Sequence, residues 1–123
     1  MSWKEVAQEV EEAYDEAQKA LGRIRPAELE RKLKLKGWRF IQPLSVGDDL
    51  SVVLKLSFKQ PKREVIESFA AAFGLKLGAI KSFDQVLVSE GGGYVGIGGG
   101  IMRISPKFPS ELLTEALKLL LSS

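Results

Sequence analysis

The sequence predicts an α+β fold, a two-layer sandwich with a mainly antiparallel sheet of about five strands, amino- and carboxyl-terminal helices and one central helix. Three observations predict it. Apolar residues recur at helical spacing near both ends and in the middle of the chain. They alternate with polar residues in the segments between, and short turns join most of those segments. The 123 residues are expected to form a single domain, 1–123.

Two helices are expected before the first strand. Residues 3–21 carry an apolar stripe at spacings of three and four, made of Trp3, Ala7, Val10, Tyr14, Ala17 and Leu21. Gly22 follows as a stop, and Pro26 suits the first position of a second helix over 26–36, with Leu29 and Leu33 inward and Gly37 as its cap. A competing interpretation extends a strand back to Leu33, so the sequence leaves 33–37 open between helix and strand.

The middle of the chain reads as two strands and a helix. Residues 38–45 are strand-like, 46–49 supply a turn, and 50–58 alternate strictly between apolar and polar residues. A helix opens at Pro61 and ends at Gly74. The side chains expected to face inward from this helix are Val65, Ile66, Phe69, Ala70 and Phe73.

The last third predicts strands over 75–80, 83–90 and 94–105, followed by a helix over 110–121. The apolar face of that helix is wide and comprises Leu112, Leu113, Ala116, Leu117, Leu120 and Leu121. The element order is compatible with the profilin, roadblock and longin type of five-stranded sheet flanked by helices.

Missing residue types limit the chemistry. The chain has no Cys, His or Asn, which excludes disulfides, thiolate or imidazole metal sites, and nucleophiles of the Cys or Ser-His kind. We therefore expect no enzyme and no cofactor. The same depletion beside 12 Lys, 12 Glu and 6 Arg is typical of a thermophile or an engineered protein. No apolar run follows a basic start, so a cytoplasmic location and no membrane partner are expected.

A glycine-rich segment stands out between residues 91 and 100. Its glycines are Gly91, Gly92, Gly93, Gly96, Gly98, Gly99 and Gly100. Three of them match G-x-G-x-x-G, but β-type residues follow where a dinucleotide site needs a helix. The favoured interpretation is that two glycine turns flank a short strand, or that another backbone approaches a strand closely. A flexible loop whose amides face an anion, with Arg103 or Lys107 nearby, is the alternative.

A basic and aromatic segment supports a second hypothesis. Residues 1–18 carry six acids against Lys4, whereas 19–39 carry eight bases against two acids, within a net charge of +2. As a strand, 34–41 would place Lys34, Lys36, Trp38 and Phe40 on one face. Residues 36–41, K-G-W-R-F-I, then resemble the aromatic signature strand of RNA-recognition motifs, although Arg39 stands where the signature has a small residue.

This resemblance implies nucleic-acid binding through Lys32, Lys34, Lys36, Trp38, Arg39 and Phe40. If 33–37 are helical instead, Gly37 is a cap and the two aromatic rings belong to the core.

Carboxylates are the remaining route to acid-base chemistry. Asp48 and Asp49 fall in the predicted turn and do not converge. Glu64 with Glu67, and Glu111 with Glu115, have the spacing of helix surfaces. An all-oxygen Mg²⁺ site stays open.

The function expected from these patterns is a non-enzymatic association module, a homodimer or an accessory subunit of a larger intracellular assembly. The amphipathic terminal helices supply either sheet-covering core or the interface with a partner. The alternative is a small nucleic-acid-binding protein that uses residues 32–40.

Overall fold

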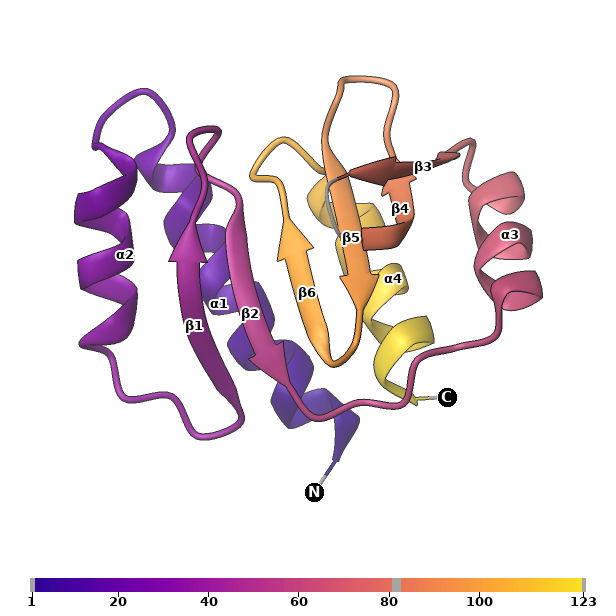
Figure 1. Cartoon of the computed structure of the whole chain (residues 1–123), viewed down its shortest axis with the longest axis horizontal. Coiled ribbons are helices and arrows are strands. Elements are labelled where there is room, and N and C mark those ends of the chain that lie inside the picture. The colour runs from indigo at the N-terminus through magenta and orange to yellow at the C-terminus, as the bar shows by residue number, and fades with distance from the viewer. Residues whose placement is uncertain (1, 81–82, 123) are drawn as a thin grey trace.

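The computed structural model describes residues 2–80 and 83–122, and it confirms the α+β class (Figure 1). The elements in chain order are α1 (Trp3–Ala20), α2 (Pro26–Lys34), β1 (Ile41–Val46), β2 (Val52–Leu56), α3 (Arg63–Ala72), β3 (Lys76–Ile80), β4 (Phe83–Val88), β5 (Tyr94–Gly98), β6 (Ile101–Ile104) and α4 (Ser110–Ser122). Among these described elements, no helix is long and apolar enough to cross a membrane.

The sheet is antiparallel, with the strand order β1-β2-β6-β5-β4-β3. It has six strands where about five were predicted, because the expected strand 94–105 is a hairpin. Gly99 and Gly100 both have positive φ, 57° and 80°. A two-residue hairpin turn of that kind needs positive φ at both central positions, so the two glycines reverse the chain.

One face of the sheet carries the main core. On β2, Val52, Leu54 and Leu56 are buried while Lys55 is exposed, so alternate side chains face the helices. The register pairs Leu54 with Met102 on β6, and both side chains are fully buried. Helices α1 and α4 lie side by side behind this face in Figure 1.

The two terminal helices pack into this core. Leu113, Ala116, Leu117 and Leu120 of α4 are buried, as the apolar pattern predicted. The Tyr14 hydroxyl of α1 donates to the carbonyl of Phe108, just before α4. The amide of Gln18 donates to the same hydroxyl at 2.7 Å. Burial, followed by the nearby charge of Asp15, raises the pKa of Tyr14.

Three predicted details need correction. Leu21 was assigned to the buried stripe of the first helix, but α1 ends at Ala20, whose side chain is buried instead while Leu21 is exposed. Val65 and Phe73 were expected to face inward from α3, and both are exposed. Helix α3 covers only the outer end of the sheet (Figure 1), so a narrower stripe of Ile66, Phe69 and Ala70 is enough to seal it.

Residues 33–37 contain no strand: 33 and 34 end helix α2, two residues short of the expected 26–36, and a turn follows. Helix α2 continues to Lys34, and Gly37 has a φ of +69° in the turn that follows. The indole nitrogen of Trp38 donates at 2.7 Å to the Leu33 carbonyl, which also accepts from the Lys36 N–H at 3.2 Å, so the ring is tied to the helix end. Residues 38–40 precede the first strand, which begins at Ile41.

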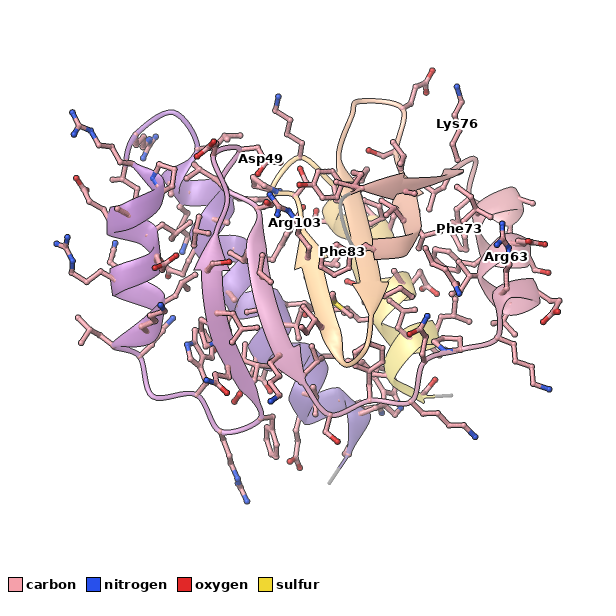
Figure 2. All side chains as sticks on the ribbon, in the orientation of Figure 1. Asp49, Arg63, Phe73, Lys76, Phe83 and Arg103 are labelled. Atoms are coloured by element: carbon pink, nitrogen blue, oxygen red, sulfur yellow. The ribbon has the colours of Figure 1, made fainter. Side chains whose placement is uncertain are left out.

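The other sheet face holds a smaller apolar cluster of Phe83, Val86 and Tyr94. Figure 2 shows Phe83 lying in front of the central strands. A Cβ atom on Gly96 would come within 3.3 Å of the Phe83 side chain. The glycine on β5 therefore lets this ring lie close to the sheet.

Two glycines of one turn should respond differently to alanine. A Cβ on Gly93 would fall 2.3 Å from the backbone of Lys107 and Phe108, whereas a Cβ on Gly91 meets nothing within 4 Å. We expect Gly93→Ala to lower the free energy of unfolding by about 2–3 kcal/mol because backbone cannot give way. Gly91→Ala should change it by less than about 0.5 kcal/mol. Urea unfolding followed by tryptophan fluorescence measures both, and equal effects would contradict the close approach at Gly93.

Candidate functional site

The two edges of the open sheet are its most informative surfaces. Strands β1 and β3 are outermost, so each has one side without a neighbouring strand. Unpaired N–H and C=O groups along such an edge can pair with another chain, and proteins usually block them. The two edges of this sheet differ in whether they are blocked.

The β1 edge is closed by its own irregularity. Its register with β2 shifts between Pro43 and Ser45, so Leu44 is an extra residue and β1 itself carries a bulge. Pro43 has no N–H to offer. Both features bend or interrupt the row of donors that a second strand would need.

Carboxylates occupy the amides at both ends of β1. Glu9 of α1 accepts from the N–H groups of Arg39, Phe40 and Ile41, with nitrogen to oxygen distances from 2.7 to 3.3 Å. Glu30 of α2 accepts from the Val46 N–H at 2.9 Å. That hydrogen bond, together with one from Lys34, lowers the pKa of the Glu30 carboxyl. The outer donors of β1 are therefore satisfied within the chain.

The β3 edge has no proline, no bulge of its own and no carboxylate partner among the described residues, and Lys76 at its start is the one charged residue in it. Lys76, Leu77, Gly78 and Ala79 are all exposed. The register with β4 also shifts here, but the extra residue belongs to β4, where Asp84 and Gln85 together oppose Ala79. Strand β3 is thus regular and free of proline, and no described side chain bonds to its backbone.

Exposed apolar side chains gather at the same end of the molecule. The large ones on the described surface are Leu21, Leu35, Val65, Phe73 and Leu77. Three of these five belong to α3, the residue after it, or β3, and Leu77 is 39% exposed. An apolar group beside an unpaired edge is the combination that strand addition uses.

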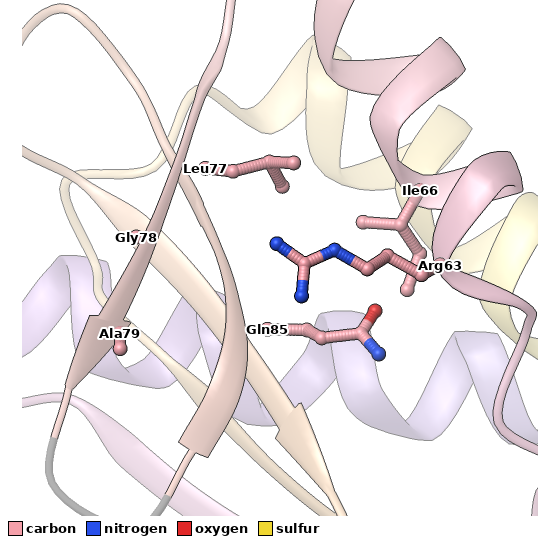
Figure 3. Close-up of a pocket in the computed structure, with 6 residues that line it drawn as sticks. All are labelled: Arg63, Ile66, Leu77, Gly78, Ala79 and Gln85. Atoms are coloured by element: carbon pink, nitrogen blue, oxygen red, sulfur yellow. The ribbon is translucent and has the colours of Figure 1, made fainter.

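A cavity of about 200 Å³ lies between α3 and the sheet and is lined by Arg63, Ile66, Leu77, Gly78, Ala79 and Gln85 (Figure 3). Arg63 reaches from α3 into the space between Leu77 and Gln85. Its Nε donates to Glu67 at 2.9 Å. The side-chain oxygen of Gln85 is buried without a partner among the described residues. This end of the sheet is incompletely packed and incompletely hydrogen-bonded.

The basic and aromatic residues do not share a strand face. Lys34 pairs with Glu30 at 3.3 Å, while Lys36 lies 3.8 Å from Glu16 and over the Trp38 ring. The acidic first helix and the basic segment thus neutralise each other in part.

The other members of that set are divided between surface and core. Trp38 and Phe40 pack partly buried against the core, and Arg39 lies over the Phe40 ring. Lys32 is exposed. Nucleic-acid binding by this set stays a prediction, and it would have to use a helix end and a loop.

The glycine-rich segment forms two turns and the strand between them. The Ser89 N–H donates to the Gly93 carbonyl at 2.7 Å in the first turn, and Gly99 and Gly100 make the second. The close backbone approach predicted for a glycine occurs at Gly93. Flexibility and anion binding in this segment stay predictions.

The charged residues of the other sheet face form a connected group. Tyr94 donates its hydroxyl to Asp49 at 2.7 Å, and Arg103 donates to the Tyr94 oxygen at 3.0 Å. The Arg103 side chain is only 11% exposed and lies 3.7 Å from Asp49 (Figure 2). Gly47 makes room for it, since a Cβ there would fall 2.3 Å from the guanidinium. Asp49 therefore acts as the counter-ion of a nearly buried cation.

The remaining carboxylates stay apart. Asp48, Glu64, Glu67, Glu90, Glu111 and Glu115 are exposed. Within residues 2–80 and 83–122, no three acidic side chains come together in a way that could hold a metal ion.

No protein-family model matches the chain, and neither curated proteins nor solved structures provide a match. Its function has to be inferred from its own geometry. That geometry favours the β3 edge, together with the α3 cavity beside it, as the candidate interaction site.

Acid should weaken the fold through Asp49. Burial alone raises the pKa of this carboxyl, but hydrogen bonds from Ser51 and Tyr94 and the charge of Arg103 outweigh it and hold the pKa below its usual value. The stabilisation is therefore complete above the pKa of the unfolded chain, about 4, and is lost as the pH falls through the lowered folded pKa.

The variant Asp49→Asn should lose about 1 kcal/mol of unfolding free energy at pH 7, because solvent weakens the interactions of a side chain that is 45% exposed. Its further loss of stability between about pH 5 and about pH 2 should be shallower than that of the wild type. Asp48→Asn, one residue away and exposed, is the control and should follow the wild type. Urea titrations across this pH range measure the difference. Identical acid profiles for wild type and Asp49→Asn would rule out the counter-ion role.

Proposed function

We propose that the chain is a non-enzymatic association module that binds a partner strand along the open edge of β3. The observation that carries the proposal is the difference between the two edges. Proline, a bulge and two carboxylates close β1, while β3 is regular and exposed and carries a single charge, Lys76, at its start. In strand addition the main-chain hydrogen bonds provide affinity, and neighbouring side chains provide selectivity.

The side chains beside β3 suit this role. Leu77, the second residue of β3, offers apolar surface on the exposed edge, and the cavity next to it can accept a side chain from a partner. Burying the 39% of Leu77 that is exposed contributes about 1 kcal/mol, to which the new strand hydrogen bonds add. A partner strand would therefore gain both kinds of contact at one place.

The terminal helices are a poorer choice of interface than the sequence suggested. Their apolar faces are buried against each other and against the sheet, and none of the exposed large apolar residues lies on α4. Association through them would require the core to open. The β3 edge needs no such rearrangement.

A second positive charge on β3, within the strand's apolar part, should weaken partner binding. Lysine on an edge strand is the device that proteins use against strand addition, so we expect Leu77→Lys to weaken binding at least tenfold. Leu35→Lys is the matched control, because Leu35 is 81% exposed and follows α2 at the opposite end of the sheet. Leu35→Lys should leave the free energy of unfolding within about 0.5 kcal/mol, and Leu77→Lys, at a residue only 39% exposed, should lower it by about 1 kcal/mol and leave the chain folded.

The binding assay uses extended peptides selected on the wild-type chain by phage display and measured by fluorescence anisotropy, together with sedimentation velocity of the chain alone. Peptide binding or self-association that Leu77→Lys removes and Leu35→Lys preserves supports the proposal. Binding that both variants retain, or a chain that neither self-associates nor selects any peptide, contradicts it.

A further inference from the structure

We propose that the strand bound at the β3 edge belongs to a second copy of this chain, paired antiparallel about a two-fold axis at Gly78. The two six-stranded sheets would then continue into each other. This inference rests on the proposed function and specifies its partner and its register.

The register of the two β3 strands follows if every residue of β3 pairs with a residue of the second copy. Strand β3 has five residues, Lys76–Ile80, and only a pairing centred on Gly78 gives each of them a partner. Lys76 then faces Ile80 of the second copy, Leu77 faces Ala79, and Gly78 faces Gly78. A two-fold axis makes every such contact occur twice, as expected for a symmetric dimer.

The position of the one charged residue and the sizes of the facing side chains both favour this register. Lys76 is the one charged residue of the strand, and the pairing places the two copies of it at opposite ends. Four residues of extended chain separate them by about 13 Å, so their repulsion is weak. Leucine faces alanine on both sides of the axis, and the two glycines at the axis add no bulk. A shift that brought Lys76 opposite itself would place like charges in contact, which destabilises a strand pair.

The same pairing brings a side chain of the second copy to the cavity beside β3. Ala79 lines that cavity, and the second copy's Leu77 stands directly opposite Ala79. Opposite side chains on one sheet face lie about 5 Å apart, which brings the leucine to the mouth of the cavity. The cavity of about 200 Å³ exceeds a cavity of ~150 Å³ that is known to admit benzene, so a leucine side chain fits. In the dimer, Leu77 of each copy would thus fill the cavity beside β3 of the other copy.

A single cysteine tests the pairing directly, because the chain contains none of its own. Residues directly opposite in antiparallel strands have Cα atoms about 4.5–5.5 Å apart, within the range of about 4.4–6.8 Å that a disulfide bridges. Gly78 tolerates the change, since its φ is not positive and a Cβ there meets only Val88, at 3.6 Å. Lys76→Cys is the control, because about 13 Å would separate its two copies.

Under mild oxidation at a protein concentration where the wild type sediments as a dimer, Gly78→Cys should form disulfide-linked dimers at least tenfold faster than Lys76→Cys. The double variant Lys76→Cys/Ile80→Cys should also cross-link fast, because its cysteines face each other. Adding Leu77→Lys to Gly78→Cys should bring cross-linking down to the rate of the Lys76→Cys control.

Two results would overturn the inference. A wild type that stays monomeric up to about 1 mM rejects the second copy as partner, and equally fast cross-linking of Gly78→Cys and Lys76→Cys rejects the register. If peptides selected on the wild type still bind and lose affinity in Leu77→Lys, the proposed function survives with another extended chain as partner. A wild type that neither forms a dimer nor binds any selected peptide rejects both the proposed function and the second copy as its partner.

Discussion

An open antiparallel sheet has a row of outward-facing backbone donors and acceptors along each edge, and among the described residues only the β1 row has donors bonded to side chains of the same chain. The β1 row is closed by Pro43, by the bulge at Leu44 and by the carboxylates of Glu9 and Glu30. The β3 row is left to the solvent or to a partner. A buried backbone group without a hydrogen bond is costly, so the identity of any β3 partner is restricted to another extended chain.

The contacts that close the β1 edge account for the positions of several charged residues in the first third of the chain. Helix α1 covers the core with its apolar stripe, and from its other side Glu9 reaches the amides that lead into β1. Helix α2 supplies Glu30 for the far end of the same strand, and Lys34 holds that carboxylate in place. The clustering of acids before bases in the sequence thus reflects contacts between neighbouring elements, with Lys36 near Glu16 as a further example.

Local patterns predicted most of the fold because they record which face of an element is buried. Helical spacing located all four helices, and alternation located the strands, with Leu50–Phe58 the clearest case. The turn at Gly99 and Gly100 agrees with the interpretation of 91–100 as two glycine turns around a short strand, but the strand range 94–105 wrongly continued through it. Val65 and Phe73 were misplaced because periodicity does not show how much of a helix the sheet covers.

The candidate site was beyond the reach of these patterns. That β3 is an edge strand follows from the strand order, which no short segment of sequence encodes. Glu9 bonds to amides about thirty positions away, and Asp49 reaches Tyr94 forty-five positions away. One local feature did carry information: Pro43 within a predicted strand points to an edge. The lack of proline in 76–80, where Lys76 is the one charged residue, can be interpreted only once the strand order shows that β3 is an edge.

Amide hydrogen exchange of β3 against β1 tests the open edge most directly. In dilute protein, the outward-facing amides of 76–80 should exchange rapidly, while those of Ile41 and Val46 should be protected by their carboxylate partners. At concentrations where the chain associates, protection should appear in β3 and remain unchanged in β1. If all β3 amides are already protected in the dilute monomer, the edge is not open and the account of this surface is wrong.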